Sequence, residues 1–250
     1  MNVYTYEQRP DLIEQVREFI PLSWPAFMLN DPVAGRLWHR LEGDFAPYQF
    51  TVCVEGDRVV AMGNTIPFAW AGPPACLPQQ GWDGVFEQAV QDRDAGRAPR
   101  ALSALQAVVR PGEQGKGLSR VILESMADIA ARHGLAHFVA PVRPSLKSAY
   151  PLAPMERYAR WALPDGCPFD PWLRAHWRRG ARVAGIAQRS MVITGTLAQW
   201  ERWTGMKFPE SGDYVVPGAL CPVQVNRERD EAVYVEPNVW MLHPPVQRKS

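Results

Sequence analysis

The sequence has almost no net charge, and this absence narrows the range of its partners. Its 27 basic and 26 acidic residues give a formal net charge of +1 at pH 7. Proteins that bind nucleic acids mainly through phosphate contacts usually carry a basic excess or a basic stripe. The densest basic cluster is short and typical of a solvated helix face; it comprises Arg174, Arg178, Arg179 and Arg182. We therefore expect no nucleic-acid partner.

Long apolar runs are absent as well. The sequence has no run of about 18 apolar residues, the minimum for a membrane-spanning helix. Its beginning, MNVYTYEQRP, does not show the basic and then apolar pattern of a secretory signal. These observations predict no membrane association.

Cysteine is scarce and scattered. The chain has four cysteines, with no CxxC pair among them: Cys53, Cys76, Cys167 and Cys221. No pair of His or Cys residues has the spacing of a zinc site. We expect reduced thiols, a cytoplasmic protein and no metal.

Proline, by contrast, is abundant. The 24 prolines are concentrated in two regions, Pro67–Pro78 and Pro141–Pro171, which hold 11 of them. Such segments cannot continue helices or central strands, so they predict long ordered loops of the kind that cover binding sites. We expect residues 67–99 and 143–169 to cover a binding site. The length of 250 residues indicates one large domain, or a core with an extension.

Hydrophobic periodicity predicts a mixture of helices and strands. Pro10 and Pro32 stand where the first turns of two helices are expected, and Asp31 is a suitable N-cap. We expect helices at 10–20, 32–42, 83–95, 118–133, 170–179 and 197–204. We expect strands at 2–6, 48–55, 59–66, 101–109, 136–142, 190–194 and 239–243, and a hairpin at 220–236 that turns at 227–230.

The best-defined region is a predicted strand–helix–strand unit. Its helix carries one apolar stripe at helical spacing, and Gly134 follows where a C-cap belongs. The flanking strands, 101–109 and 136–142, should be parallel and joined by a right-handed crossover. The stripe comprises Leu118, Val121, Ile122, Met126, Ile129 and Ala130.

The loop between this strand and this helix carries the chemistry. Gly112, Gly115 and Gly117 precede the helix, together with Lys116. The first N–H groups of a helix lack internal partners and carry a positive partial charge. Glycines allow a pyrophosphate to approach such a backbone closely. The segment therefore predicts an anion cradle.

Two common phosphate loops do not fit this segment. A Walker A loop needs four residues between its first glycine and Gly-Lys, but only two separate Gly112 from Gly115. The dinucleotide fingerprint GxGxxG needs a third glycine, and Arg120 stands in that position.

The segment Gln114-Gly-Lys-Gly-Leu-Ser119 resembles instead the Q/R-x-x-G-x-G/A signature of the GNAT acyltransferase superfamily. Ser119 departs from the usual Gly or Ala, but it is small enough to pack closely. The similarity extends over about residues 45–140. It implies an α/β fold with a mixed, mostly antiparallel sheet, a central parallel βαβ unit, helices on both faces and a C-terminal extension. Residues 1–142 would form the core with the acyl-CoA loop. Residues 143–250 would complete the sheet and cover the acceptor site.

The resemblance also implies which residues bind the cofactor. Gln114, Gly115, Lys116, Gly117, Leu118 and Ser119 would surround the CoA pyrophosphate. Ala107, Val108 and Val109 would offer backbone groups to the pantetheine. In this family the strands corresponding to 101–109 and 136–142 splay apart, and the cofactor lies between them.

The catalytic residues are less well defined. Strand 101–109 has no carboxylate, and Gln106 can orient water but cannot act as a base. The base would be Glu87 or Asp83, or it would be absent. Two residues could stand where the family has an acidic tyrosine for the leaving thiol: Tyr150, or His176 if residues 143–169 are an insertion. Five tryptophans could line an aromatic acceptor pocket or pack in the core: Trp161, Trp172, Trp177, Trp200 and Trp203.

We therefore predict an enzyme that transfers an acetyl or short acyl group directly from acyl-CoA to the amine of a small molecule or peptide. Its co-substrate would be acetyl-CoA or another acyl-CoA, and a homodimer is compatible with the sequence. Two alternatives stay open at this point. One is a non-catalytic acyl-CoA sensor or scaffold, and the other is an O- or S-acyltransferase of a biosynthetic pathway.

Overall fold

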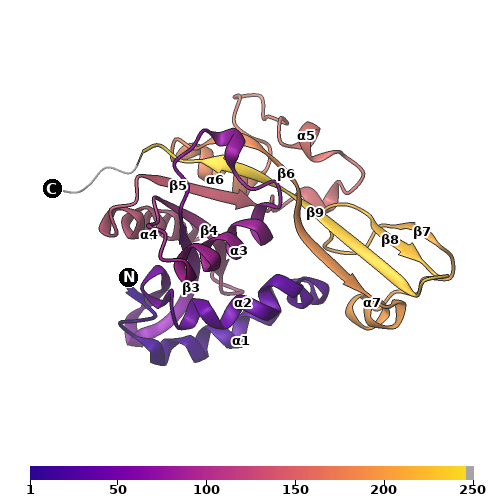
Figure 1. Ribbon diagram of the computed structural model, residues 1–250, viewed down its shortest axis with the longest axis horizontal. Coiled ribbons are helices and arrows are strands. Elements are labelled where there is room, and N and C mark those ends of the chain that lie inside the picture. Colours follow the sequence, from indigo (N-terminus) through magenta and orange to yellow (C-terminus); the bar gives the residue numbers. More distant parts are fainter. Residues whose placement is uncertain (246–250) are drawn as a thin grey trace.

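Nine strands form one mixed sheet within residues 1–245, the part of the chain that the computed structural model describes (Figure 1). Their order across the sheet is β1-β2-β3-β4-β5-β9-β8-β7, with β6 paired to the other edge of β9. All neighbours are antiparallel except β4 and β5, which are parallel, as the strand–helix–strand unit predicts. The strands are β1 (Asn2–Thr5), β2 (Gln49–Val54), β3 (Arg58–Phe68), β4 (Ala101–Val109), β5 (His137–Val142), β6 (Arg182–Gly195), β7 (Gly212–Tyr214), β8 (Val223–Asn226) and β9 (Glu231–Leu242).

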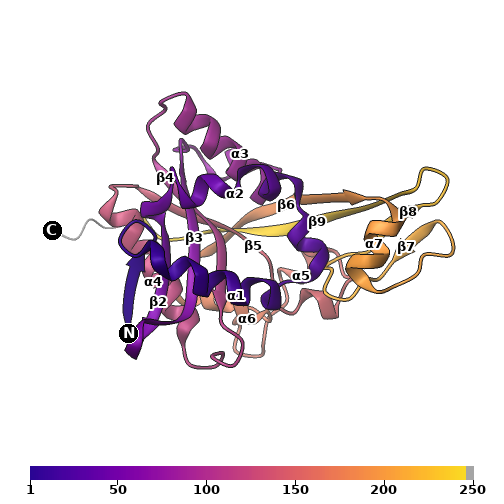
Figure 2. The same ribbon diagram turned by 90° about the horizontal axis from the view of Figure 1, so that it is seen from below.

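Helices cover both faces of this sheet. Helices α1 (Ile13–Ser23), α2 (Pro32–Glu42) and α3 (Gly81–Asp94) lie on one face, where Val108 of β4 packs with α1 and Leu105 packs with α3. On the other face are α4 (Leu118–Arg132), α5 (Met155–Tyr158) and α6 (Pro171–Arg178). Figure 2 shows α1 and α2 lying across the first face. The helices predicted at 10–20, 32–42, 83–95, 118–133 and 170–179 are confirmed within a few residues.

The C-terminal part forms a long ribbon. Strands β6 and β9 pair along most of their length and extend beyond the core, where α7 (Leu197–Thr204), β7 and β8 are attached (Figure 1). Both strands are longer than the sequence predicts. In β6, the pairing with β9 continues across two register shifts, at 183–185 and at 187–191. Strand β9 also runs without a break through 231–242, where the sequence predicts two separate strands.

The central parallel pair opens after three residues. Ala101, Leu102 and Ser103 of β4 pair with His137, Phe138 and Val139 of β5, and the pairing then stops. Pro141 supplies a reason. The Phe138 carbonyl accepts a hydrogen bond from the His243 N–H, so the backbone groups of Phe138 face the β9 side. Backbone groups alternate between the two edges of a strand, so those of Pro141, three residues later, face β4. Proline has no N–H, and a hydrogen bond to β4 is therefore missing at this position. The predicted splay between these strands is therefore confirmed.

Candidate active site

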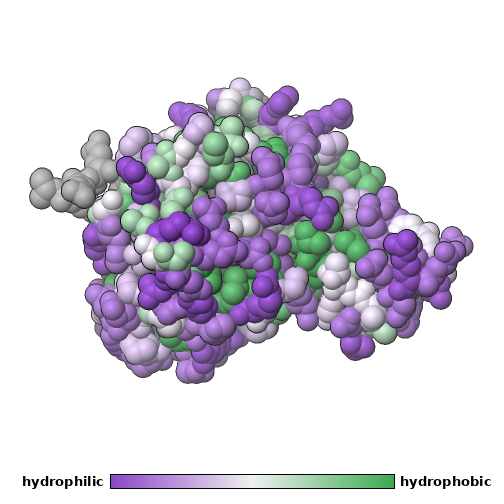
Figure 3. Space-filling model, in the orientation of Figure 1, coloured by the Kyte–Doolittle hydropathy of each residue, from purple (hydrophilic) through white to green (hydrophobic). Residues whose placement is uncertain are grey.

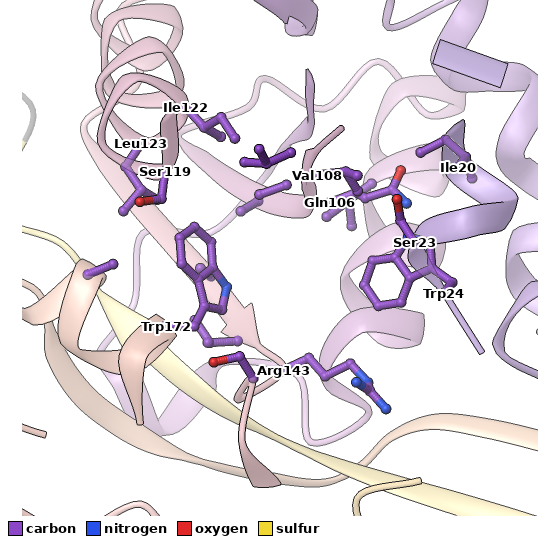
Figure 4. A pocket seen from close by; sticks show the side chains of 18 of the residues that line it. Ile20, Ser23, Trp24, Gln106, Val108, Ser119, Ile122, Leu123, Arg143 and Trp172 are labelled. Carbon is purple, nitrogen blue, oxygen red and sulfur yellow. The ribbon is translucent and has the colours of Figure 1, made fainter. Parts of the chain in front are cut away.

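A deep cleft of about 1160 Å³ passes through the opening between β4 and β5. In Figure 4, Ser119, Ile122 and Leu123 of α4 lie on one side, and Ser23, Trp24 and Gln106 lie on the other. Hydrophobic surface also gathers in hollows above α1 and α2 in the view of Figure 3. The cleft thus connects the α4–α6 face with the α1–α2 face. Its lining includes Ala104–Val109, Gln114, Gly115, Gly117–Ser119, Ala140–Arg143, Trp172 and His176, together with Trp24, Met28, Trp38 and Trp82.

The predicted anion cradle stands at one end of this cleft. Gly112, Gly115 and Gly117 have φ angles of 85°, 80° and 76°, in the left-handed region that favours glycine. Gly117 is the N-cap of α4, and no side chain caps the first turn of that helix. The N–H groups at the start of α4 are therefore available to an anion.

Side chains of the loop hold its shape. Gln114 accepts a hydrogen bond from the Gly112 N–H at 2.8 Å. Glu113 is bound by Lys116 at 2.8 Å and by Arg58 at 2.7 Å, and these two hydrogen bonds lower the pKa of Glu113 to about 2. Lys116 is turned toward Glu113 and does not line the cleft, unlike the other predicted residues of the loop.

Strand β4 forms the floor beside the cradle. Ala107, Val108 and Val109, the residues predicted to contact the pantetheine, all line the cleft. They pair with β3 on one side only, so their other edge faces the opening toward β5. A strand edge of this kind leaves N–H and C=O groups for an extended ligand.

A β-bulge in β4 changes the direction of one side chain. Thr65 of β3 pairs with Ala104 and Asn64 pairs with Gln106, so Leu105 is the extra residue. The bulge places Leu105 and Gln106 on the α1–α2 face, whereas strict alternation would send Gln106 to the α4 face. Its Oε1 is buried without a hydrogen-bond partner in the described structure. The Gln106 side chain lines the cleft, and its carbonyl oxygen has an unused hydrogen-bond acceptor site.

His176 lies on the opposite face, on α6. It is 1% exposed, and its Nδ1 lies 2.9 Å from Nε2 of His243. Its Nε2 has no partner among the described residues. Burial and the neighbouring imidazole keep the pKa of His176 well below its ordinary value, and burial lowers the pKa of His243 to about 4. Both rings are therefore neutral near pH 7, and His176 lies in the cleft lining with one buried ring nitrogen that has no partner among the described residues.

Tyr150, the other candidate for the acid, is placed differently. It is 40% exposed and belongs to an aromatic cluster with Tyr158, Trp161 and Phe169. It does not line the cleft. The structure therefore brings His176 to the cleft and leaves Tyr150 outside the lining.

The two carboxylates considered as bases are also away from the lining. Glu87 forms a surface ion pair with Arg36 at 2.5 Å. Asp83 is buried beside Asp31 and accepts a hydrogen bond from the Val192 N–H at 3.1 Å. Burial, and then the charge of Asp31, raise the pKa of Asp83 to about 8. Oδ2 of Asp31 and Oδ1 of Asp83 have no hydrogen-bond partner among the described residues, so burial and mutual repulsion favour the protonated form of one of the two carboxyls.

Arg143 and the N-terminal aromatic residues were not predicted as site residues. The cleft takes only Trp82 from residues 67–99, and only Arg143 and Ser145 from residues 143–169. Much of the α1–α2 side of the lining comes from residues 20–38 instead. The apolar stripes of α1 and α2 signal helices in the sequence, but they do not reveal that Trp24 and Trp38 line a cleft.

Two other features bear on the kind of site that the described residues can form. Within residues 1–245, no helix is long and apolar enough to cross a membrane. In the same part of the chain, no group of three or more His, Cys, Asp or Glu residues could hold a metal ion.

Comparison with known proteins adds independent evidence. No family model matches the chain. It is 34% identical to the arginine N-acetyltransferase avaD of Aspergillus versicolor, over 97% of this chain and 93% of that protein.

Solved structures share the fold. The loading GNATL domain of CurA from Lyngbya majuscula has a TM-score of 0.66 and 17% identity, over 99% of this chain and 98% of that one. The GphF GNAT-like decarboxylase, solved in complex with isobutyryl-CoA, has a TM-score of 0.59 and 17% identity, over 99% and 100%.

Three observations indicate the same family: the glycine loop before α4, the splayed strands β4 and β5, and a relative that matches almost the whole chain. This chain belongs to the GNAT superfamily, and it is an N-acyltransferase that moves an acyl group from acyl-CoA to an amine.

Proposed function

We propose that this enzyme acetylates the amine of a small molecule, with acetyl-CoA as donor and by direct transfer. One observation carries the proposal: a single cleft joins the anion cradle on the α4 side to an aromatic chamber on the α1–α2 side. A donor that enters from the cradle and an acceptor that enters from the chamber would meet where β4 and β5 part. Such a meeting places both reactants together without a covalent enzyme intermediate.

The donor would be held by backbone groups. The pyrophosphate would bind at Gln114–Ser119, since several N–H groups and the start of α4 converge there. Lys116 would join them only by leaving Glu113. The pantetheine would lie along Ala107–Val109 like an added strand, because that edge of β4 has no partner.

In the transfer step, the amine nitrogen would attack the thioester carbon, and the carbon–sulfur bond would break. The amine then loses a proton and the CoA thiolate gains one. The lining has no carboxylate near the opening of the strands, so the amine would enter already neutral. Gln106 Oε1 would accept a hydrogen bond from the amine or from a water that carries its proton.

Of the two residues considered for the thiol, the cleft favours His176. His176 belongs to the lining and its buried Nε2 has no partner among the described residues, whereas Tyr150 packs in an aromatic cluster outside the lining. We propose that His176 forms a hydrogen bond to the donor near its sulfur and that His243 orients the ring. His176→Phe should lower kcat by more than about tenfold, the loss expected when one hydrogen bond to a charged sulfur is removed. An unchanged kcat would leave His176 a packing residue.

The acceptor is suggested by the relative, whose name states that it acetylates arginine. We propose an amine of this kind, arginine being the first one to test. The assay combines acetyl-CoA with purified enzyme and single amines, measures released thiol, and identifies the acetylated product by mass spectrometry. Steady thiol release with an N-acetyl product is the expected result. Binding of acetyl-CoA with no thiol release for any amine would instead favour the sensor, and ester or thioester products would favour an O- or S-acyltransferase.

The donor site has its own test. Ser119→Glu places a carboxylate at the start of α4, where it would repel a pyrophosphate, and Ser119→Gln is the control of equal size without charge. Calorimetric titration of acetyl-CoA should show strong loss of affinity for the first variant only. Equal affinities for both variants would place the pyrophosphate elsewhere.

Cytoplasmic location, a homodimer, and the absence of metal, membrane and nucleic-acid partners stay predictions from the sequence.

A further inference from the structure

Arg143 follows β5 directly and lies on the acceptor side of the opening. Its guanidinium carbon is 5.9 Å from the ring centroid of Trp24, the residue that ends α1. Figure 4 shows both side chains at the same side of the cleft, away from Ser119 and Leu123. Arg143 therefore belongs to the acceptor chamber rather than to the donor cradle.

The guanidinium is fixed from behind by buried groups. Its Nε donates to both oxygens of Glu236, at 2.9 and 3.1 Å, and its Nη2 donates to the Gly218 carbonyl at 2.6 Å. Glu236 is fully buried and also accepts hydrogen bonds from the Tyr234 hydroxyl and the Asn238 amide. These bonds hold one edge of the guanidinium plane in place.

The opposite edge is not used by the protein. No hydrogen bond from Nη1 of Arg143 is present in the described residues, and the side chain is 19% exposed. Apart from Arg143, the only Lys, Arg, Asp or Glu in the described lining is Glu113, which stands at the cradle and is bound by Lys116 and Arg58. The acceptor chamber thus has one oriented cation in a mostly apolar and aromatic wall, and no facing carboxylate.

We propose that Arg143 binds a carboxylate of the acceptor, so that the enzyme selects amino acids with a free carboxylate over the corresponding simple amines. A guanidinium held along one edge can offer its remaining N–H groups to a carboxylate with little loss of conformational freedom. This inference rests on the proposed function. It narrows the acceptor from an amine to an amino acid, a class to which the relative's arginine belongs.

Wild-type enzyme provides the first test with acceptors matched in all but the carboxylate, and rates are compared per concentration of neutral amine, because loss of the carboxylate also raises the pKa of the neighbouring amine. Suitable pairs are arginine and agmatine, lysine and cadaverine, and tryptophan and tryptamine, with arginine amide as an analogue that lacks only the carboxylate charge. We expect kcat/KM for the preferred amino acid to exceed that for its decarboxylated partner by about 10- to 100-fold, the range for a charge-assisted hydrogen bond. The difference should lie mainly in KM, because the carboxylate is bound equally before and during transfer.

Variants then assign the preference to Arg143. Changing Arg143→Gln together with Glu236→Gln removes both charges, so that no buried carboxylate is left without its partner. This double variant should lose the preference, so that kcat/KM for the amino acid falls to about the value for the simple amine. Glu236→Gln alone keeps the cation and should keep the preference. Arg179→Gln removes a guanidinium that pairs with Glu124 outside the lining. This control should change neither the preference for the amino acid nor the activity on the simple amine. Thermal unfolding and acetyl-CoA binding check that each variant is folded.

The outcomes separate this inference from the proposed function. If the wild type acetylates simple amines and the corresponding amino acids with equal kcat/KM, the Arg143 proposal is wrong. The proposed N-acetyltransferase activity then still stands. If no amine of either kind is acetylated, the proposed function fails and the inference fails with it. A third arm compares acetyl-CoA with succinyl-CoA. A preference for succinyl-CoA that disappears in the double variant would show that Arg143 binds the donor's carboxylate, and would overturn the assignment to the acceptor.

Discussion

Replacing Asp83 by Asn should make the protein more stable at neutral pH. Asp83 lies on α3, 8% exposed, beside the buried carboxyl of Asp31. An asparagine keeps the acceptor for the Val192 N–H and supplies an amide donor to Asp31. Asp31 in turn keeps its place as the N-cap of α2, where it accepts from the Ala34 N–H at 2.8 Å.

The size of the effect follows from the pKa of Asp83. That pKa is raised to about 8 in the folded protein, against about 3.9 in an unfolded chain. Below about pH 4 the carboxyl is protonated in both the folded and the unfolded state, so it does not reduce the free energy of unfolding. As the pH rises toward 8, the unfolded chain loses this proton more readily than the folded protein, and the free energy of unfolding falls. At pH 7 the pH lies about three units above the unfolded-state pKa, and the resulting loss of folding free energy is about 4 kcal/mol. At pH 5 the difference is about one unit, and the loss is about 1.4 kcal/mol. Since the pair shares this penalty, we expect Asp83→Asn to gain on the order of 2–4 kcal/mol at pH 7.

Urea unfolding followed by tryptophan fluorescence measures this gain between pH 4 and 8.5. Wild type and Asp83→Asn should have similar free energies of unfolding at pH 4 and should diverge as the pH rises. Asp92→Asn is the matched control, because Asp92 lies buried on the same helix but is paired with Arg97 at 2.6 Å. That change should destabilise the protein. A difference between wild type and Asp83→Asn that does not vary with pH would refute the argument that one of the two carboxyls is protonated.

Three further predictions concern the loop, the packing and the pH profile. Glu113→Gln frees Lys116 and removes a negative charge from the cradle, so calorimetry at low salt should show acetyl-CoA bound about two- to fivefold more tightly, an effect that salt should weaken. Gly81→Ala should cost about 2–4 kcal/mol in urea unfolding, because φ is +46° and the added Cβ would stand 2.2 Å from the Ser190 hydroxyl oxygen; Gly185→Ala, which meets nothing within 4 Å, should be nearly neutral. The logarithm of kcat/KM should rise with pH up to the pKa of the acceptor amine, without a break near pH 6.5, because His176 stays neutral throughout that range; such a break would show that His176 titrates there.

Much of the donor half of this protein is predictable from local sequence. The apolar stripe of α4, the glycines before it and the flanking strands are features of neighbouring residues, and the structure has the predicted helix and the parallel strand pair. Pro141 is another local feature of this kind, because a proline in β5 cannot donate a backbone hydrogen bond to β4. These features depend on backbone conformation and hydrogen bonding within a few residues, which sequence patterns report directly.

The acceptor half required the tertiary structure. Trp24 and Trp38 come from α1 and α2, Arg143 comes from the end of β5, and Glu236, which holds Arg143, comes from β9. A one-residue bulge turned Gln106 toward these groups, and burial brought Asp31 and Asp83 together. Local sequence determined the backbone at which we propose that a pyrophosphate binds, because a loop and the start of one helix supply it. Which side chains face the acceptor was decided only by the packing of distant segments, because direction and burial depend on register and on neighbours that no short stretch of sequence contains.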